Sequence, residues 1–196
     1  MSEIITINTD AGTEIQKVKV FDLIPETDPI LKEVLPEFDF SNPPINPTQL
    51  ASLLVETCKA NNGLGLSANQ CGLPYRVFVM GSGDNFVAFF NPKIIAASQE
   101  EVLMTEGCLS FPMLALNVKR PAGVVVEYQN HLGETKRENF TGLSGRCFLH
   151  ELDHMNGVLY TSRAKPLALQ QGLKKRKKIN GLITKAKKSV EKIGRK

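Results

Sequence analysis

The motif His-Glu-Leu-Asp-His at residues 150–154 predicts a central helix with two different sides, around which the rest of the chain is expected to pack. It matches the H-E-x-x-H pattern, in which two histidines one turn apart can bind a metal ion. At about 100° per residue, His154 lies about 40° round from His150 and Glu151 about 100° round, and Cys147 projects into the same sector. The opposite side carries the apolar residues Phe148, Leu152 and Met155. We therefore expect one side of this helix to pack and the other to carry chemistry.

A metal ion at this helix needs a third protein ligand and an open position. The alternative is a core helix whose histidines only form hydrogen bonds, but the chain has three histidines and two of them bracket a glutamate at this spacing. The other one, His131, stands in a polar turn and is interpreted as a solvated loop residue. No histidine follows His154, and the only glutamate after it is Glu191 in a basic tail, so the third ligand is expected upstream.

The composition indicates a soluble globular protein of the size of one domain. Its 196 residues are 42% hydrophobic and 22% charged, which excludes a largely disordered chain, a collagen-like repeat and a coiled coil. The sequence has neither an apolar run of about 20 residues nor a secretory signal, so we expect a cytoplasmic location and no membrane partner. In that compartment four cysteines are expected as free thiols: Cys58, Cys71, Cys108 and Cys147.

The net charge of +4 hides a division into an acidic body and a basic tail. Residues 170–196 contain eleven Lys and Arg but a single acid, whereas residues 1–169 carry a net charge of −6. We predict a catalytic domain over residues 1–166 and a basic helical tail over residues 167–196. Apolar residues recur at intervals of three or four in the tail, which predicts an amphipathic helix that would break near Asn180-Gly181.

Local patterns predict the other elements. Asn46 followed by a proline reads as the start of a helix that ends at Asn61, and a second helix is expected from about Ser144 to Asn156. Runs of β-branched and aromatic residues predict antiparallel strands at residues 75–80, 85–90 and 123–128, the first two joined by a turn at residues 81–84. The fold class is α+β, with antiparallel β-sheets packed around the central helix of residues 150–154 and a C-terminal helix.

Two further segments carry residues that suit a metal-dependent site. Residues 63–70, Gly-Leu-Gly-Leu-Ser-Ala-Asn-Gln, form a glycine-rich loop. The loop lacks the Lys-Ser/Thr of a phosphate-binding loop and the third glycine of a dinucleotide fingerprint, so it is not interpreted as a nucleotide site. Residues 106–110, Glu-Gly-Cys-Leu-Ser, place a cysteine in a turn of small residues.

These three segments, in this order, resemble the peptide deformylase family. The signatures of that family are G-x-G-x-[AS]-A-x-Q, E-G-C-[LI]-S and H-E-x-D-H, and the resemblance covers roughly residues 20–165. The chain departs from the family at Ser67, where alanine is commonest, and in a longer Pro-rich segment at the N-terminus. Neither departure touches an implied metal ligand.

The resemblance implies that Cys108, His150 and His154 bind one divalent metal ion, with water in the fourth position. A thiolate and two neutral imidazoles suit Fe(II), Zn(II), Ni(II) or Co(II). The resemblance implies Fe(II) as the physiological ion, for which Zn(II), Ni(II) or Co(II) could substitute.

The resemblance also implies the reaction, which removes the N-formyl group from the N-terminal methionine of newly synthesised proteins and releases formate. A bound metal ion would lower the pKa of a water molecule, and Glu151 would take the proton and later pass it to the leaving amine. The side-chain amide of Gln70 and the backbone N–H of Leu109 would stabilise the charge that develops on the formyl oxygen.

The resemblance further implies which residues contact the substrate. Gly63 and Gly65 would let the backbone of an N-formylmethionyl peptide approach and pair in the manner of a strand. The methionine side chain would enter an apolar pocket, although an ordinary core role is the alternative for the residues concerned: Leu64, Met104, Leu143 and Cys147. Arg120 and Glu106 could pair near the site.

The tail has two interpretations, a helix packed on the body or a helix that contacts ribosomal RNA near the exit of the nascent chain. Sequence-specific DNA binding is not expected. Two functions remain as alternatives to deformylation. One is a metallopeptidase that cuts internal amide bonds, and the other is a non-enzymatic ribosome- or RNA-binding module whose metal is structural.

Overall fold

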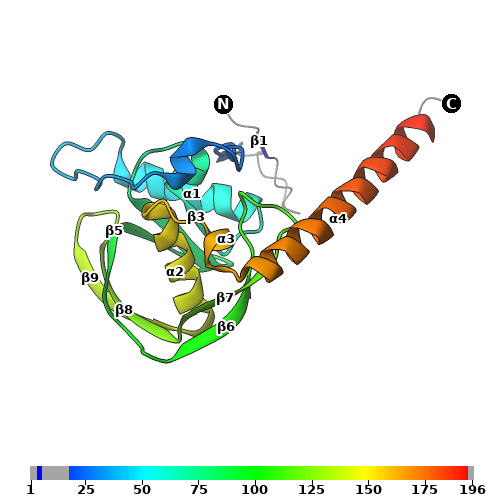
Figure 1. Cartoon of the computed structure of the whole chain (residues 1–196). Coiled ribbons are helices and arrows are strands. Elements are labelled where there is room, and N and C mark those ends of the chain that lie inside the picture. Colours follow the sequence, from blue (N-terminus) through cyan, green and yellow to red (C-terminus); the bar gives the residue numbers. More distant parts are fainter. Residues whose placement is uncertain (1–3, 6–17, 194–196) are drawn as a thin grey trace.

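The structure is a computed structural model that describes residues 4–5 and 18–193 (Figure 1). Its strands are β1 (Ile4–Ile5), β2 (Val18–Lys19), β3 (Gly65–Ser67), β4 (Val77–Ser82), β5 (Asn85–Ala97), β6 (Glu101–Glu106), β7 (Leu116–Pro121), β8 (Gly123–Gln129) and β9 (Thr135–Thr141). Its α-helices are α1 (Pro47–Ala60), α2 (Gly142–Met155), α3 (Tyr160–Arg163) and α4 (Pro166–Ile193). Two short 3-10 helices, η1 (Pro29–Lys32) and η2 (Ala68–Cys71), lie in the connections.

The main layer is a five-stranded antiparallel sheet in the order β3-β4-β5-β8-β9. β6 and β7 form a separate antiparallel pair. In Figure 1 the sheet curves through β5, β8 and β9, and α2 lies on its concave side. The expected α+β class is confirmed, with antiparallel sheets around the helix that carries residues 150–154 and a C-terminal helix.

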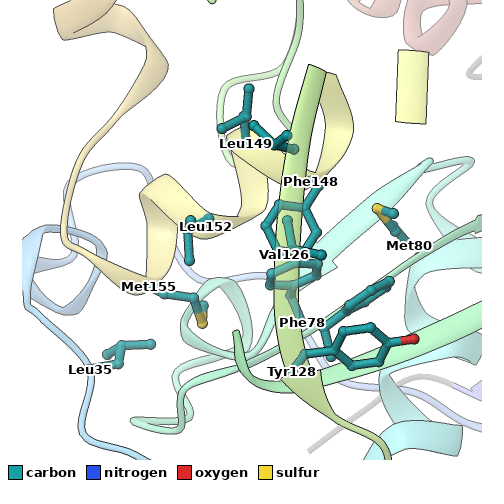
Figure 2. Packing of buried hydrophobic residues seen from close by; sticks show 11 residues of the cluster. Leu35, Phe78, Met80, Val126, Tyr128, Phe148, Leu149, Leu152 and Met155 are labelled. Atoms are coloured by element: carbon teal, nitrogen blue, oxygen red, sulfur yellow. The ribbon is translucent and has the colours of Figure 1, made fainter. Parts of the chain in front are cut away.

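The apolar side of α2 packs into the main core (Figure 2). The ring centroid of Phe148 lies 5.3 Å from that of Phe78 and 5.5 Å from that of Phe89. The same core contains Leu152 and Met155 from α2 and Val126 and Tyr128 from β8. The predicted packing side is confirmed, and its burial leaves the histidine side of α2 against β3 and the segment after β6.

The first predicted helix begins and ends where the sequence placed it. The side-chain oxygen of Asn46 accepts a hydrogen bond from the backbone N–H of Gln49 at 3.0 Å, which satisfies one donor at the open end of α1. At the other end Asn62 takes a positive φ of 55°, and the helix stops. Between these ends, α1 buries one side against β3 and β4 through Leu50, Leu54 and Cys58.

Several predicted boundaries need correction. The strand predicted at residues 75–80 is β4 at Val77–Ser82, which leaves only residues 83–84 for the turn, and the helix expected from Ser144 begins at Gly142. Residues 63–70 are not a simple loop, because they contain β3 and η2. The strand predicted at residues 85–90 continues as β5 to Ala97, since irregular register after Phe90 accommodates Pro92, which has no N–H to donate. The break expected near Asn180-Gly181 is absent, because one glycine in an exposed helix costs only about 1 kcal/mol relative to alanine.

α4 projects away from the rest of the molecule (Figure 1). Its first turns contact the body, where a Cβ atom on Gly172 would lie 2.7 Å from Leu116 and 3.1 Å from Leu114. One turn later Arg176 forms an ion pair with Glu26. The helix is exposed from residue 180 to residue 190. None of the helices in the described ranges is both long and apolar enough to cross a membrane.

Phe148→Ala tests the core role of α2. Phe148 is fully buried against two strand aromatics, so we expect a loss of about 3–5 kcal/mol in the free energy of unfolding. Denaturant unfolding would measure it. Leu182→Ala, at a site in α4 that is 58% exposed, should change stability by less than about 0.5 kcal/mol. Similar losses in the two variants would contradict the packing described.

Candidate metal centre

The structure brings Cys108, His150 and His154 together. One potential ligand atom from each residue lies within 4.8 Å of the others, and Cys108 Sγ is 3.4 Å from His154 Nε2. The two histidines come from successive turns of α2, and the cysteine comes from the segment that follows β6. A sulfur and two imidazole nitrogens around one point form a donor set able to hold a divalent metal ion.

Glu106 determines which nitrogen of His150 faces this cluster. Its Oε2 lies 3.0 Å from His150 Nδ1, which leaves Nε2 for the cluster. Burial lowers the pKa of His150, but hydrogen bonds with Cys108 and Glu106 outweigh burial and raise the pKa to about 10. Burial lowers the pKa of His154 well below its ordinary value. A metal ion has to displace the proton from His150, because the neutral imidazole is the ligand form.

Glu106 itself belongs to a set of buried ion pairs. Arg120 donates to both oxygens of Glu106, at 2.6 and 2.9 Å, and Arg146 donates to Oε1 at 2.9 Å. Arg120 also reaches Asp153 on α2 at 2.6 Å. Burial alone would raise the pKa of Glu106, but the hydrogen bonds from Arg120, His150 and Arg146 hold it well below its usual range. The pairing of Arg120 with Glu106 that the sequence suggested is present.

Glu151 lies beside the cluster in a confined position. Its carboxylate is buried, and Oε2 accepts a hydrogen bond from Ser67 Oγ at 2.7 Å. Burial raises the pKa of Glu151, while His150 and Ser67 oppose this shift. A Cβ atom on Gly65 would lie 2.5 Å from Glu151 Oε1 and 2.8 Å from Cys147 Sγ. Glycine at this position therefore leaves room for the carboxylate.

The orientation of the Gln70 amide follows from its neighbours. Its Oε1 accepts a hydrogen bond from the backbone N–H of Ser67 at 2.9 Å. Because a backbone N–H can only donate, the NH₂ group must point the other way, where it lies 3.4 Å from Cys108 Sγ and 3.0 Å from Ser110 Oγ. Gln70 therefore presents a donor beside the sulfur of the cluster.

A cavity of about 340 Å³ opens beside the cluster. Most residues predicted to contact substrate or reacting groups line it: Gly63, Leu64, Gly65, Gln70, Leu109, Leu143, Cys147 and Glu151. Met104 is not among the lining residues. On β6 the lining begins at the next residue, Thr105. His131 lies outside the cavity, in the turn between β8 and β9.

Arg146 is a lining residue that helical spacing could have predicted. Arg146 stands four residues before His150, so the same helical spacing places it on the reactive side of α2. It is buried, donates to the backbone carbonyls of Val118 and Val102, and joins the β6-β7 pair to α2. Ser67 had a weaker signal, since alanine is commonest at that position, and only the fold shows that its hydroxyl meets Glu151.

Comparison with known proteins gives the family. Residues 20–170 match the family model described as polypeptide deformylase. The chain belongs to the peptide deformylase family. It is an amidohydrolase that removes the formyl group from the N-terminal methionine of proteins, as the sequence predicted, and the family is metal-dependent.

Known peptide deformylases align with more than half of this chain. The chain is 45% identical to the peptide deformylase of Thermotoga neapolitana over 113 residues, which cover 58% of this chain and 69% of that one. It is 39% identical to that of Finegoldia magna over 148 residues, which cover 74% of this chain and 90% of that one. A solved peptide deformylase from Synechococcus elongatus, in complex with actinonin, has a TM-score of 0.74 at 30% identity, covering 80% of this chain and 87% of that one.

Glu106→Gln tests whether the buried ion pairs of this peptide deformylase support metal binding. The amide keeps the shape but leaves Arg120, Arg146 and His150 without their carboxylate. We expect metal affinity to fall about 10–100-fold, measured by competition with a chelator. We also expect about 3–5 kcal/mol of lost stability, because one partner of a buried pair is removed.

Glu101→Gln on the same strand is the matched control. Glu101 pairs with Lys119 at 3.3 Å, and the two side chains are 49% and 63% exposed. An exposed pair of this kind contributes at most about 1 kcal/mol. If Glu101→Gln and Glu106→Gln weakened metal binding equally, the role given to the buried pairs would be wrong.

Proposed function

We propose that Cys108, His150 and His154 hold one divalent metal ion and that this ion is Fe(II). The closeness of one sulfur and two imidazole nitrogens supports the ligand set. So does the carboxylate of Glu106, which holds His150 with Nε2 toward the cluster. Thiolate and imidazole ligands also accept Zn(II), Ni(II) or Co(II), so these ions are expected to support activity when Fe(II) is replaced.

In the proposed mechanism, Glu151 is the general base and acid. When bound, the metal ion would polarise the formyl carbonyl and lower the pKa of a water molecule. Glu151 accepts the proton of the attacking water and passes it to the leaving amine, so that formate and a free N-terminus are released. Its buried position and raised pKa favour a carboxyl group that both takes and returns a proton.

Gln70 and Leu109 are proposed to stabilise the negative charge on the formyl oxygen. The NH₂ group of Gln70 is held toward the cluster by the bond between its oxygen and Ser67. Leu109 follows Cys108 directly and lines the same cavity, which supports its backbone N–H as the second proposed donor. One such donor contributes about 2.7–4 kcal/mol to lowering the barrier.

The N-formylmethionyl peptide is proposed to bind as an added strand. β3 is at the edge of the five-stranded sheet, and β6 has one unpaired side in its two-stranded pair. Gly65 of β3 and Thr105 of β6 both line the cavity, so an extended peptide can lie between the two strands. A similar enzyme from Acinetobacter baumannii, with a TM-score of 0.70 at 31% identity, has been solved with Met-Ala-Ser bound, covering 74% of this chain and 99% of that one.

The methionine side chain is proposed to occupy the apolar part of the cavity. Leu64, Leu143 and Cys147 supply its apolar walls, and Gly63 and Gly65 let the peptide backbone approach. Met104 is not among the residues that line the cavity, although its neighbour Thr105 is, and its contact with the methionine side chain stays a prediction.

The basic tail, residues 167–196, is proposed to dock the catalytic domain, residues 1–166, on ribosomal RNA. The exposure of α4 from residue 180 to residue 190 and the excess of Lys and Arg in the tail support this role. Docking would bring the site close to emerging N-formylmethionyl chains. It also fits a cytoplasmic location, which stays a prediction.

The general-base role is tested with Glu151→Gln and formyl-Met-Ala-Ser. Formate release should fall by about 10²–10⁴-fold, because proton transfer is lost while the shape is kept. Metal content measured on anaerobically purified protein should stay at the wild-type value. Glu134→Gln, in the turn between β8 and β9, should retain full activity.

The same assay separates the alternatives. Cleavage of unformylated peptides by the wild type would favour a metallopeptidase. A wild-type protein that binds metal but releases no formate would favour a structural metal site.

Ribosome docking is tested by co-sedimentation at increasing salt. Gln in place of Lys185, Lys187 and Lys188 leaves the contacts of Gly172 and Arg176 with the body intact. If these lysines contact phosphate, binding should weaken and its dependence on salt should become shallower. Gln in place of Lys93, Lys119 and Lys136, all outside α4, is the control for net charge. Equal loss in the two triple variants, or none in the tail variant, would contradict docking through α4.

A further inference from the structure

Three polar residues around η2 each reach a different group of the site. Ser67 donates to Glu151, and Gln70 donates toward Cys108. The third residue is Asn69, whose side-chain nitrogen lies 3.0 Å from the backbone oxygen of His154. The signature G-x-G-x-[AS]-A-x-Q leaves the position of Asn69 open, so the family pattern gives this residue no role.

Asn69 is held in one orientation. Its side chain is fully buried, and the same nitrogen lies 3.4 Å from the backbone oxygen of Ile30 in η1. Because both neighbours are carbonyl oxygens, which only accept hydrogen bonds, the NH₂ group must face them. The side-chain oxygen of Asn69 is also buried, and it has no hydrogen-bond partner among the described residues. The NH₂ group therefore joins three segments, η2, η1 and the end of α2.

The backbone carbonyl of His154 lies in the last turn of α2, where helix geometry leaves it free to accept the hydrogen bond from Asn69. The last four carbonyls of a helix have no partner one turn further on, and α2 ends at Met155. The His154 oxygen also accepts a weak bond from Gly157 N–H at 3.3 Å. The bond from Asn69 ties this carbonyl to η2, and together with the bonds from Leu35 and Arg76 to the carbonyl of Met155 it holds the last turn of α2, which carries the His154 imidazole.

We propose that Asn69 is a positioning residue that sets the place of His154 relative to Gln70. Gln70 follows Asn69 directly in η2, so one short turn carries both the donor beside Cys108 and the tie to the helix of the two histidines. Asn69 acts through these neighbours, since it is not among the described residues that line the cavity. The proposal rests on the proposed function of Gln70 and His154.

The test replaces the amide with an apolar group of similar size. Asn69→Leu removes the donor and keeps the volume, and Asn69→Ala repeats the loss with less risk of misfolding. Thr57→Val is the matched control, because Thr57 is also fully buried and its hydroxyl also bonds to backbone groups, those of Leu53 and Phe21. All variants are loaded with Co(II), and their visible spectrum, Co(II) affinity by chelator competition, kcat, KM and melting temperature are measured.

We expect the Asn69 variants to bind Co(II) about 10–100-fold more weakly and to show an altered Co(II) spectrum. Their kcat should fall about 10-fold while KM stays within about twofold, because the lining of the cavity is unchanged. Thr57→Val should lose thermal stability and keep wild-type values for the other measurements.

Wild-type Co(II) affinity and kcat in a folded Asn69→Ala protein would overturn the proposal, whatever its melting temperature. Equal effects in Thr57→Val would also overturn it, since general loosening would then explain the loss. An inactive wild type would count against the proposed function, whereas the Co(II) affinities and spectra would still decide the role of Asn69.

Discussion

Buried ion pairs between the β6-β7 pair and α2 are the interaction on which the rest of the site depends. Arg120 lies between Glu106 and Asp153, Arg146 pairs with Glu106, and the partly exposed Arg163 also pairs with Asp153, so three guanidinium groups face two carboxylates. Taking each charge out of water costs several kcal/mol, which is recovered only when every charge has well-placed partners. Because Glu106 also contacts His150, the pairs that join strand to helix also orient a proposed metal ligand.

Space around β3 imposes the second constraint. A Cβ atom on Gly65 would collide with the side chains of Glu151 and Cys147, so glycine at this position lets β3 lie close to α2 without displacing them. This approach lets Ser67 reach Glu151 and lets Asn69 reach the end of α2. The short helix η2, which carries Gln70, is thereby held beside Glu151 through its N-cap residue Ser67. The fold holds them through backbone and side-chain bonds that are all buried.

Much of the fold could be predicted because its signals are local. Asn46 and Asn62 mark the ends of α1 through capping and positive φ, and the spacing of Phe148, Leu152 and Met155 gives the packing side of α2. The length of β5 could not be predicted, since Asn91-Pro92 is a local stop signal that pairing with β8 overrides. The continuity of α4 through Gly181 was not predicted either, because a glycine lowers the stability of a helix but does not end it.

The amino-acid sequence alone specifies the chemistry available to this protein. It gave the cysteine, the two histidines and the glutamate in family motifs, and the charge division between body and tail. How these groups are held depends on contacts that form when the chain folds. Arg120 and Asp153 are 33 residues apart, and Asn69 and His154 are 85 apart, so no periodicity along the chain indicates that they meet. Such contacts form only when strands and helices pack around a common core. Hydrophobic burial drives this packing and is not directional, so it does not reveal in advance which polar residues will meet.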